Sequence, residues 1–134
     1  MLEIYTDGAC SPNPGLGGWA AIFVLDGKVM DEIYGYVEDT TNNRMELLAV
    51  IKALEWCGDT NVKMFSDSGY VVNTLTKGWA KNKNIDLWAR LDSLTKYRNI
   101  EWIWVKGHAS NAYNSRCDEL AVKARINKIT NFED

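Results

Sequence analysis

An aspartate lies in the interior of the first predicted strand of this 134-residue chain. Residues 4–10, preceded by Leu2, alternate between two faces as a strand does, and Asp7 falls on the face that carries Tyr5. Burying a lone carboxylate in a core costs several kcal/mol or more, so Asp7 needs a cation or a proton. Gly8 follows at once, where a side chain would block the close approach of another group to the backbone. An edge-strand ion pair with a lysine would explain Asp7 alone, so its meaning depends on the other acidic residues.

The composition is typical of one globular domain, which we expect to span residues 1–134. No apolar run approaches the roughly 20 residues of a membrane span, and the N-terminus lacks the basic and apolar regions of a signal peptide. The cysteines, Cys10, Cys57 and Cys117, are too widely spaced for a disulfide framework or a CxxC metal motif. We therefore expect a cytoplasmic protein with no membrane partner.

The charge is distributed unevenly along the chain. Residues 1–76 contain four basic and eleven acidic residues, a balance of −7, whereas residues 77–106 contain seven basic and three acidic residues, a balance of +4. A basic segment facing an acidic half fits a polyanion held on one side and metal ions held on the other. A solvated helix surface would carry the same charges, so charge alone does not separate the two interpretations.

Strand and helix signals alternate after an initial hairpin. Asp26-Gly27 is a strong two-residue turn signal, so strands at 19–25 and 28–36 should pair antiparallel. The later strands follow helices, and a strand reached by a helical crossover runs parallel to its neighbour. The predicted fold class is therefore α/β, with a five-stranded mixed sheet of three antiparallel and then two parallel strands flanked by helices. The other expected elements are helices at 43–56, 68–75, 85–96 and 114–126, strands at 62–66 and 100–105, a basic loop at 77–84 and a frayed tail at 127–134.

In such sheets, sites form beyond the carboxyl ends of the parallel strands, and four acidic residues from different elements are candidates for a site if they converge there. Converging carboxylates repel one another and need neutralisation, and an all-oxygen ligand set favours hard cations such as Mg²⁺ or Mn²⁺. Two such ions about 4 Å apart would clamp an in-line phosphoryl displacement. His108 could transfer protons near neutral pH, although a lone histidine after a strand is more often structural. The four acids, chosen from 18 in the chain, are Asp7, Glu46, Asp67 and Asp118.

Several short motifs are spread in order over nearly the whole chain: TDGAC at 6–10, NPG at 13–15, TNNRMEL at 41–47, SDS at 66–68, WVKGH at 104–108 and NSRCDELA at 114–121. Together these motifs resemble those of bacterial-type ribonuclease H, type 1. The resemblance implies an endonuclease that cuts the RNA strand of an RNA–DNA hybrid duplex and leaves 5′-phosphate and 3′-hydroxyl ends. It also implies that Asp7, Glu46, Asp67 and Asp118 bind two Mg²⁺ ions, or Mn²⁺, and that His108 handles protons.

Substrate contacts are also implied by the resemblance. Amide side chains near the first helix match positions that touch the minor groove or the RNA strand, where the 2′-hydroxyl distinguishes RNA from DNA. Two further positions match a pocket for a phosphate of the DNA strand, and this pocket should be weaker here because Asp39 replaces an arginine found in many relatives. Turn and helix-cap roles would explain the same amides. The expected contact residues are Gly8, Asn13, Asn42 and Asn43, with Thr41 and Asn84 for the phosphate.

The segment between Leu75 and Trp88 departs from many relatives, which insert a Lys/Trp-rich helix there to grip the hybrid. We expect a reduced platform of Trp79 with Lys77, Lys81 and Lys83, although loop packing explains Trp79 equally well. We also expect no separate hybrid-binding domain, no obligate protein partner and a monomer.

Other functions share parts of this pattern. A junction-cutting or retroviral-type nuclease of the same fold would keep the acids, but Asn42, Asn43 and the start at Met1 speak against both. A non-catalytic nucleic-acid-binding module would gain by losing four negative charges. A simple divalent-ion binder would not explain the asparagines or the basic segment.

Overall fold

The computed structural model describes residues 1–106 and 111–133. A five-stranded sheet has the order β3-β2-β1-β4-β5, with β1, β2 and β3 antiparallel and β4 and β5 parallel to β1. This topology confirms the predicted fold class. The strands are β1 (Leu2–Cys10), β2 (Gly15–Leu25), β3 (Lys28–Thr40), β4 (Val62–Ser66) and β5 (Ile100–Trp104), and the helices are α1 (Asn42–Cys57), α2 (Gly69–Lys77), α3 (Ile85–Thr95) and α4 (Ala112–Asn127).

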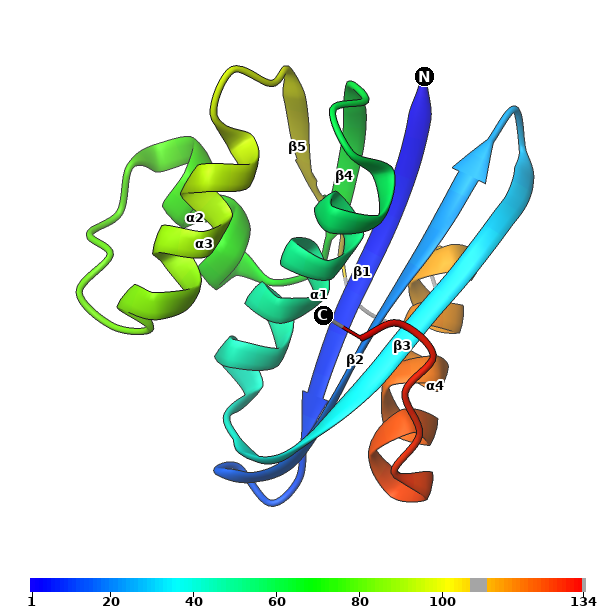
Figure 1. The fold of residues 1–134 in the computed structure, drawn as a ribbon, viewed down its shortest axis with the longest axis vertical. Coiled ribbons are helices and arrows are strands. Elements are labelled where there is room, and N and C mark those ends of the chain that lie inside the picture. The colour runs from blue at the N-terminus through cyan, green and yellow to red at the C-terminus, as the bar shows by residue number, and fades with distance from the viewer. Residues whose placement is uncertain (107–110, 134) are drawn as a thin grey trace.

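Helices cover both faces of the sheet (Figure 1). The alternation of β1 sends Ile4 into a large core shared with α1, α2 and α3, and sends Tyr5 into a smaller core formed with α4. Two glycines allow the helices to lie close to the strands. A side chain at Gly8 would meet the backbone of α1, with Glu46 N 2.5 Å from the added carbon, and one at Gly18 would meet the backbone of α4. No helix within the described residues is long and apolar enough to cross a membrane.

The two hairpin strands are longer than the sequence predicts. β2 begins at Gly15 instead of residue 19, and β3 continues to Thr40 instead of residue 36. The glycines at the start of β2 have low intrinsic strand propensity, but Gly17 pairs with Cys10 of β1 and Gly15 with Thr40 of β3. Pairing on both sides therefore extends the sheet where local propensity does not.

The C-terminal tail was expected to be frayed, and this expectation is wrong for residues 128–133. The tail crosses the outer edge of β3 (Figure 1). Asn131 N donates to Tyr34 O at 2.9 Å, and the Asn131 side chain accepts from Tyr34 N at 2.7 Å. Thr130 Oγ1 accepts from Tyr36 N at 3.2 Å, and Phe132 packs against the larger core. The tail is ordered because it satisfies backbone groups that an edge strand leaves unpaired.

Candidate active site

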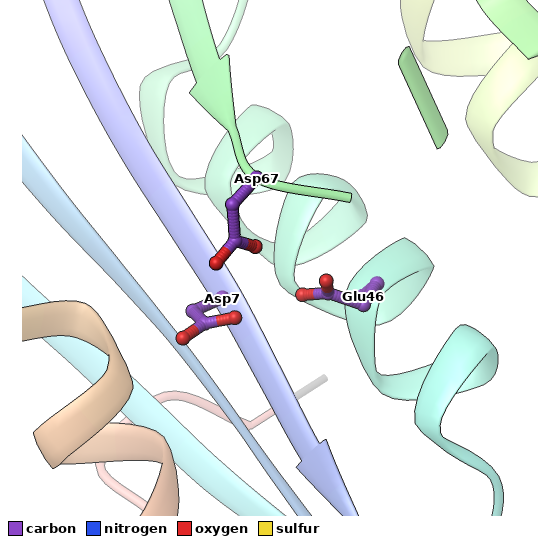
Figure 2. Close-up of side chains that lie close together, drawn as sticks. All are labelled: Asp7, Glu46 and Asp67. Carbon is purple, nitrogen blue, oxygen red and sulfur yellow. The ribbon is translucent and has the colours of Figure 1, made fainter. Parts of the chain in front are cut away.

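Three of the predicted acids meet at the centre of the sheet. One carboxylate oxygen each from Asp7, Glu46 and Asp67 lies within 4.8 Å of the others. Figure 2 shows the three carboxylates directed toward one another from β1, from the first turns of α1 and from the residue after β4. The fold causes this convergence, because β1 and β4 are parallel neighbours and the absent side chain at Gly8 lets α1 approach β1.

Local hydrogen bonds fix the backbone around each acid. Asp7 Oδ1 accepts a hydrogen bond from Gly8 N at 2.9 Å. Glu46 lies in the first turns of α1, whose N-cap Thr41 accepts from Arg44 N at 3.2 Å. Asp67 stands between β4 and α2, next to the N-cap of α2, Ser68.

Burial and neighbouring negative charge raise the pKa of two of these carboxylates, Asp7 and Glu46. Burial, with a further contribution from the charge of Asp67, raises the pKa of Asp7 to about 8. Burial and the charge of Asp7 raise the pKa of Glu46 well above its usual value. The relative exposures of Asp7 and Glu46 are only 4% and 7%, so water does little to offset the repulsion.

One oxygen of Glu46 lacks the partner that a buried acceptor normally has. Glu46 Oε1 is buried and accepts no hydrogen bond from the described residues. A buried acceptor next to two other carboxylates is suited to a hard cation, which would satisfy the oxygen and neutralise the charge together.

Asp118 was expected to converge with these three acids. It is not part of the cluster, whose carboxylate oxygens all lie within 4.8 Å of one another. It occupies the exposed side of α4, whose buried side carries Cys117 and Ala121. Its negative charge nevertheless contributes to raising the pKa of Asp7. Asp118 therefore borders the group of three, and its role as a metal ligand stays a prediction. His108 lies outside the described residues, so its predicted proton transfer also stays a prediction.

The residues expected to bind substrate connect the loop after β1 with the start of α1. The side-chain Oδ1 of Asn13 accepts a hydrogen bond from the backbone N–H of Asn42 at 3.1 Å, which ties the Asn13 loop to the start of α1. Asn43 follows Asn42 in the first turn of the helix. Gly8, also expected at the substrate, has a clear structural role because α1 packs on it.

Arg44 links the two residues of the expected phosphate pocket, a role that the motif around it does not predict. Its backbone N–H bonds to Thr41, and its Nη1 donates to Asn84 Oδ1 at 3.3 Å. The guanidinium also forms a bidentate ion pair with Asp86. The separation of 40 residues between Arg44 and Asn84 hides this contact from any local pattern.

The basic segment that follows α2 is partly engaged within the protein. Lys81 Nζ pairs with Asp92 at 2.9 Å and lies 5.3 Å from the ring centroid of Trp88. Trp79 is 50% exposed, in agreement with an accessible aromatic side chain. Lys83 lies in the same loop and is exposed. The predicted platform therefore presents Trp79 and Lys83 more openly than Lys81.

Relatives of known family match most of the chain. Residues 1–126 match the model of the RNase H family. The ribonuclease H of Francisella tularensis subsp. novicida is 50% identical over 134 residues, which cover 90% of this chain and 88% of the relative. The ribonuclease H of Acetivibrio thermocellus is 46% identical over 135 residues, which cover 90% of this chain and 91% of the relative.

Solved structures agree with these matches. LC11-RNase H1, isolated from compost and solved in complex with an RNA/DNA hybrid, superposes with a TM-score of 0.81 at 28% identity, covering 95% of this chain and 98% of the other. RNase H1 from the halophilic archaeon Halobacterium salinarum gives a TM-score of 0.77 at 30% identity, covering 96% and 98%. The chain has the same fold as these proteins and a cluster of three acids at the centre of its sheet, and relatives match it over nearly its whole length. It therefore belongs to the ribonuclease H family of nucleases.

Proposed function

We propose that this protein hydrolyses the RNA strand of RNA–DNA hybrid duplexes and leaves 5′-phosphate and 3′-hydroxyl ends. The observation that carries the proposal is the group of three carboxylates, Asp7, Glu46 and Asp67, within 4.8 Å of one another in a chain of the ribonuclease H family. LC11-RNase H1, a structural relative, was solved with such a hybrid bound, which supports the choice of substrate.

The chemistry of the donor set supports two Mg²⁺ ions, with Mn²⁺ as a substitute. All donors in the group are carboxylate oxygens, which favour hard cations over zinc. The buried and unpartnered Glu46 Oε1 is a further sign that a cation belongs there. Asp7, Glu46 and Asp67 would hold the ions, with Asp118 at the border of the site. When bound, two ions activate the attacking water and stabilise the leaving oxygen of an in-line displacement.

The protein's own residues position the substrate around this centre. Asn13, Asn42 and Asn43 lie together where the loop after β1 meets α1, and their amides can both donate to and accept from a 2′-hydroxyl. A substrate that lacks this hydroxyl leaves such groups unpaired, which favours the RNA strand over DNA. His108 transfers a proton during turnover, at the leaving group or the attacking water.

The DNA strand is held through a phosphate near Thr41 and Asn84. Arg44 bonds to both residues and brings a positive charge to a pocket where Asp39 replaces the arginine of many relatives. The charge of Arg44 is shared with Asp86, so the pocket holds phosphate weakly. Trp79, Lys81 and Lys83 add a small second contact surface, in which Lys81 is weakened by its pairing with Asp92.

The enzyme acts as one domain and a monomer in the cytoplasm. The three cysteines are all free thiols, which suits a reducing compartment. Both cores are formed by the chain's own strands, helices and tail, which supports a monomer.

A panel of labelled duplexes tests the proposed substrate. The RNA–DNA hybrid, double-stranded RNA, double-stranded DNA and a four-way DNA junction, each labelled on one strand, are incubated with the enzyme and Mg²⁺. We expect cleavage of the RNA strand of the hybrid alone, with products that a ligase can join because they carry 5′-phosphate ends. Cleavage of the junction or of DNA would contradict the proposal and favour another nuclease of this fold.

A further inference from the structure

Trp104 connects the edge strand of the sheet to the backbone of Asp67. It is the last residue of β5, and its indole Nε1–H donates a hydrogen bond to Asp67 O at 3.2 Å. The side chain is 54% exposed, whereas Trp19 and Trp88 are each 2% exposed. Leaving a large aromatic ring in water gives up the free energy that its burial would supply. The structure keeps the ring at this position with its polar group directed at a candidate metal ligand.

The indole bond begins where the backbone ladder between β4 and β5 ends. Ser66 and Trp104 are the last residues paired across the two strands, and Val105 N donates to Ser66 O at 2.9 Å. Asp67 O is the next carbonyl along the chain, just after β4 ends, and the indole supplies its donor. A side chain therefore extends the pairing of β4 with β5 by one residue, as far as Asp67.

The residues on either side of Asp67 are also fixed. Ser66 Oγ accepts from Ser68 N at 3.1 Å, and Ser68 Oγ caps α2 by accepting from Val71 N at 3.2 Å. Asp67 thus lies between two restrained serines, and the indole holds its own carbonyl. Together these bonds fix the direction in which the Asp67 carboxylate leaves the backbone toward Asp7 and Glu46.

We propose that Trp104 is a positioning residue for the divalent-metal site, acting through Asp67 and touching neither metal nor substrate. This inference rests on the proposed function, in which Asp67 is a metal ligand. Metal–ligand distances in protein sites fall within about 0.2 Å of their usual values, so the position of a ligand matters. Loss of a group that orients a ligand costs about 10- to 100-fold in metal affinity or activity. Because the indole contacts the main chain of Asp67 and not its carboxylate, we expect the lower end of this range.

Trp104→Phe tests the role, because it keeps an aromatic ring and removes only the N–H donor. Calorimetric titration of the free protein with Mg²⁺, repeated with Mn²⁺, should show binding weakened about 10-fold. Turnover should need a correspondingly higher Mg²⁺ concentration, with the KM for the hybrid unchanged. In EDTA, the Ser68 and Val105 amides should exchange their hydrogens faster than in the wild-type protein, because the connection between β4 and α2 is less restrained.

Trp56→Phe is the matched control. It removes an indole donor of the same kind, whose Nε1 bonds to Asp31 at 3.0 Å, while its ring stays stacked on Phe23. Asp31 lies on the exposed part of β3 and is not one of the three clustered acids. We expect Trp56→Phe to change the melting temperature about as much as Trp104→Phe and to leave metal binding unchanged.

The outcomes separate this inference from the proposed function. Wild-type protein that binds neither Mg²⁺ nor Mn²⁺ and cleaves no hybrid would overturn the proposed function and the role of Trp104 with it. Wild-type binding matched by Trp104→Phe would overturn the role of Trp104 alone. An increase in the KM for the hybrid with unchanged metal affinity would also overturn it, because the indole would then serve substrate binding.

Discussion

Replacement of Asp7 by asparagine should stabilise the metal-free protein, by an amount that grows with pH. The folded protein raises the pKa of Asp7 from 3.8 to about 8, mainly through burial and then through the charge of Asp67. Between these two pH values the folded state binds more protons than the unfolded state, so the free energy of unfolding falls as the pH rises. Below pH 4 the carboxyl group is neutral in both states and has no such effect.

The pKa change sets the size of the effect. A rise of about 4 pKa units, at about 1.36 kcal/mol each, sets an upper limit of about 6 kcal/mol at pH 8 on the gain in unfolding free energy from Asp7→Asn. Entry of water and relaxation of the site reduce this limit in the wild-type protein. We expect at least a third of it, about 2 kcal/mol, which corresponds to a melting temperature about 8 °C higher for a domain of this size. Asparagine keeps the acceptor for Gly8 N, so the substitution preserves the local hydrogen bond.

Melting temperatures in EDTA at pH 4, 6 and 8 provide the measurement. The difference between Asp7→Asn and wild type should be near zero at pH 4 and largest at pH 8, and excess Mg²⁺ should reduce it because cations bind the wild-type site more tightly. Asp59→Asn, an exposed carboxylate in the turn after α1, should show no such trend. Parallel curves for Asp7→Asn and wild type would refute the conclusion that Asp7 is buried among repelling carboxylates.

Three further predictions concern other parts of the molecule. His108→Ala should lower turnover about 10²-fold with little change in hybrid affinity, and single-turnover kinetics with a binding assay would show whether affinity falls instead. Replacing Lys77, Lys81 and Lys83 together by alanine should raise the KM for a short hybrid and reduce the slope of its salt dependence by up to about 0.9 per lost phosphate contact. Among the single variants, Lys81→Ala should have the smallest effect. An unchanged salt slope would mean that this segment does not contact the substrate. Asn131→Ala removes two side-chain hydrogen bonds to β3 and should lower the free energy of unfolding by about 1–3 kcal/mol in urea titrations, whereas an unchanged midpoint would mean that the tail does not stabilise the edge strand.

Strong local signals made most of the fold predictable. The Asp26-Gly27 turn specified the hairpin, and the helical crossovers required the later strands to be parallel to β1. Pairing with distant strands determined two segments that were predicted wrongly, the start of β2 and the C-terminal tail. The glycine-rich start of β2 has little strand propensity of its own, and the tail has no hydrophobic period, yet both are ordered by backbone groups of neighbouring strands.

The candidate site was predictable for a different reason. Composition and spacing could not single out Asp7, Glu46 and Asp67 among the acids of the chain; the motifs shared with a known family did so, and the structure brings these three together. Contacts between residues distant in the sequence were hidden, including Arg44 with Asn84 and Trp104 with Asp67. The position of Asp118 outside the group depends on how α4 packs on the sheet, which no local pattern records.

The rate of hybrid cleavage by Asp7→Asn, measured beside wild type with Mg²⁺ and with EDTA, tests most directly whether the three carboxylates form a catalytic metal site. Wild type should cleave the RNA strand only when Mg²⁺ is present, and Asp7→Asn should be folded and inactive in both conditions, while Asp59→Asn keeps wild-type turnover. Cleavage by folded Asp7→Asn at the wild-type rate, or cleavage by wild type after complete removal of divalent metal, would contradict this assignment.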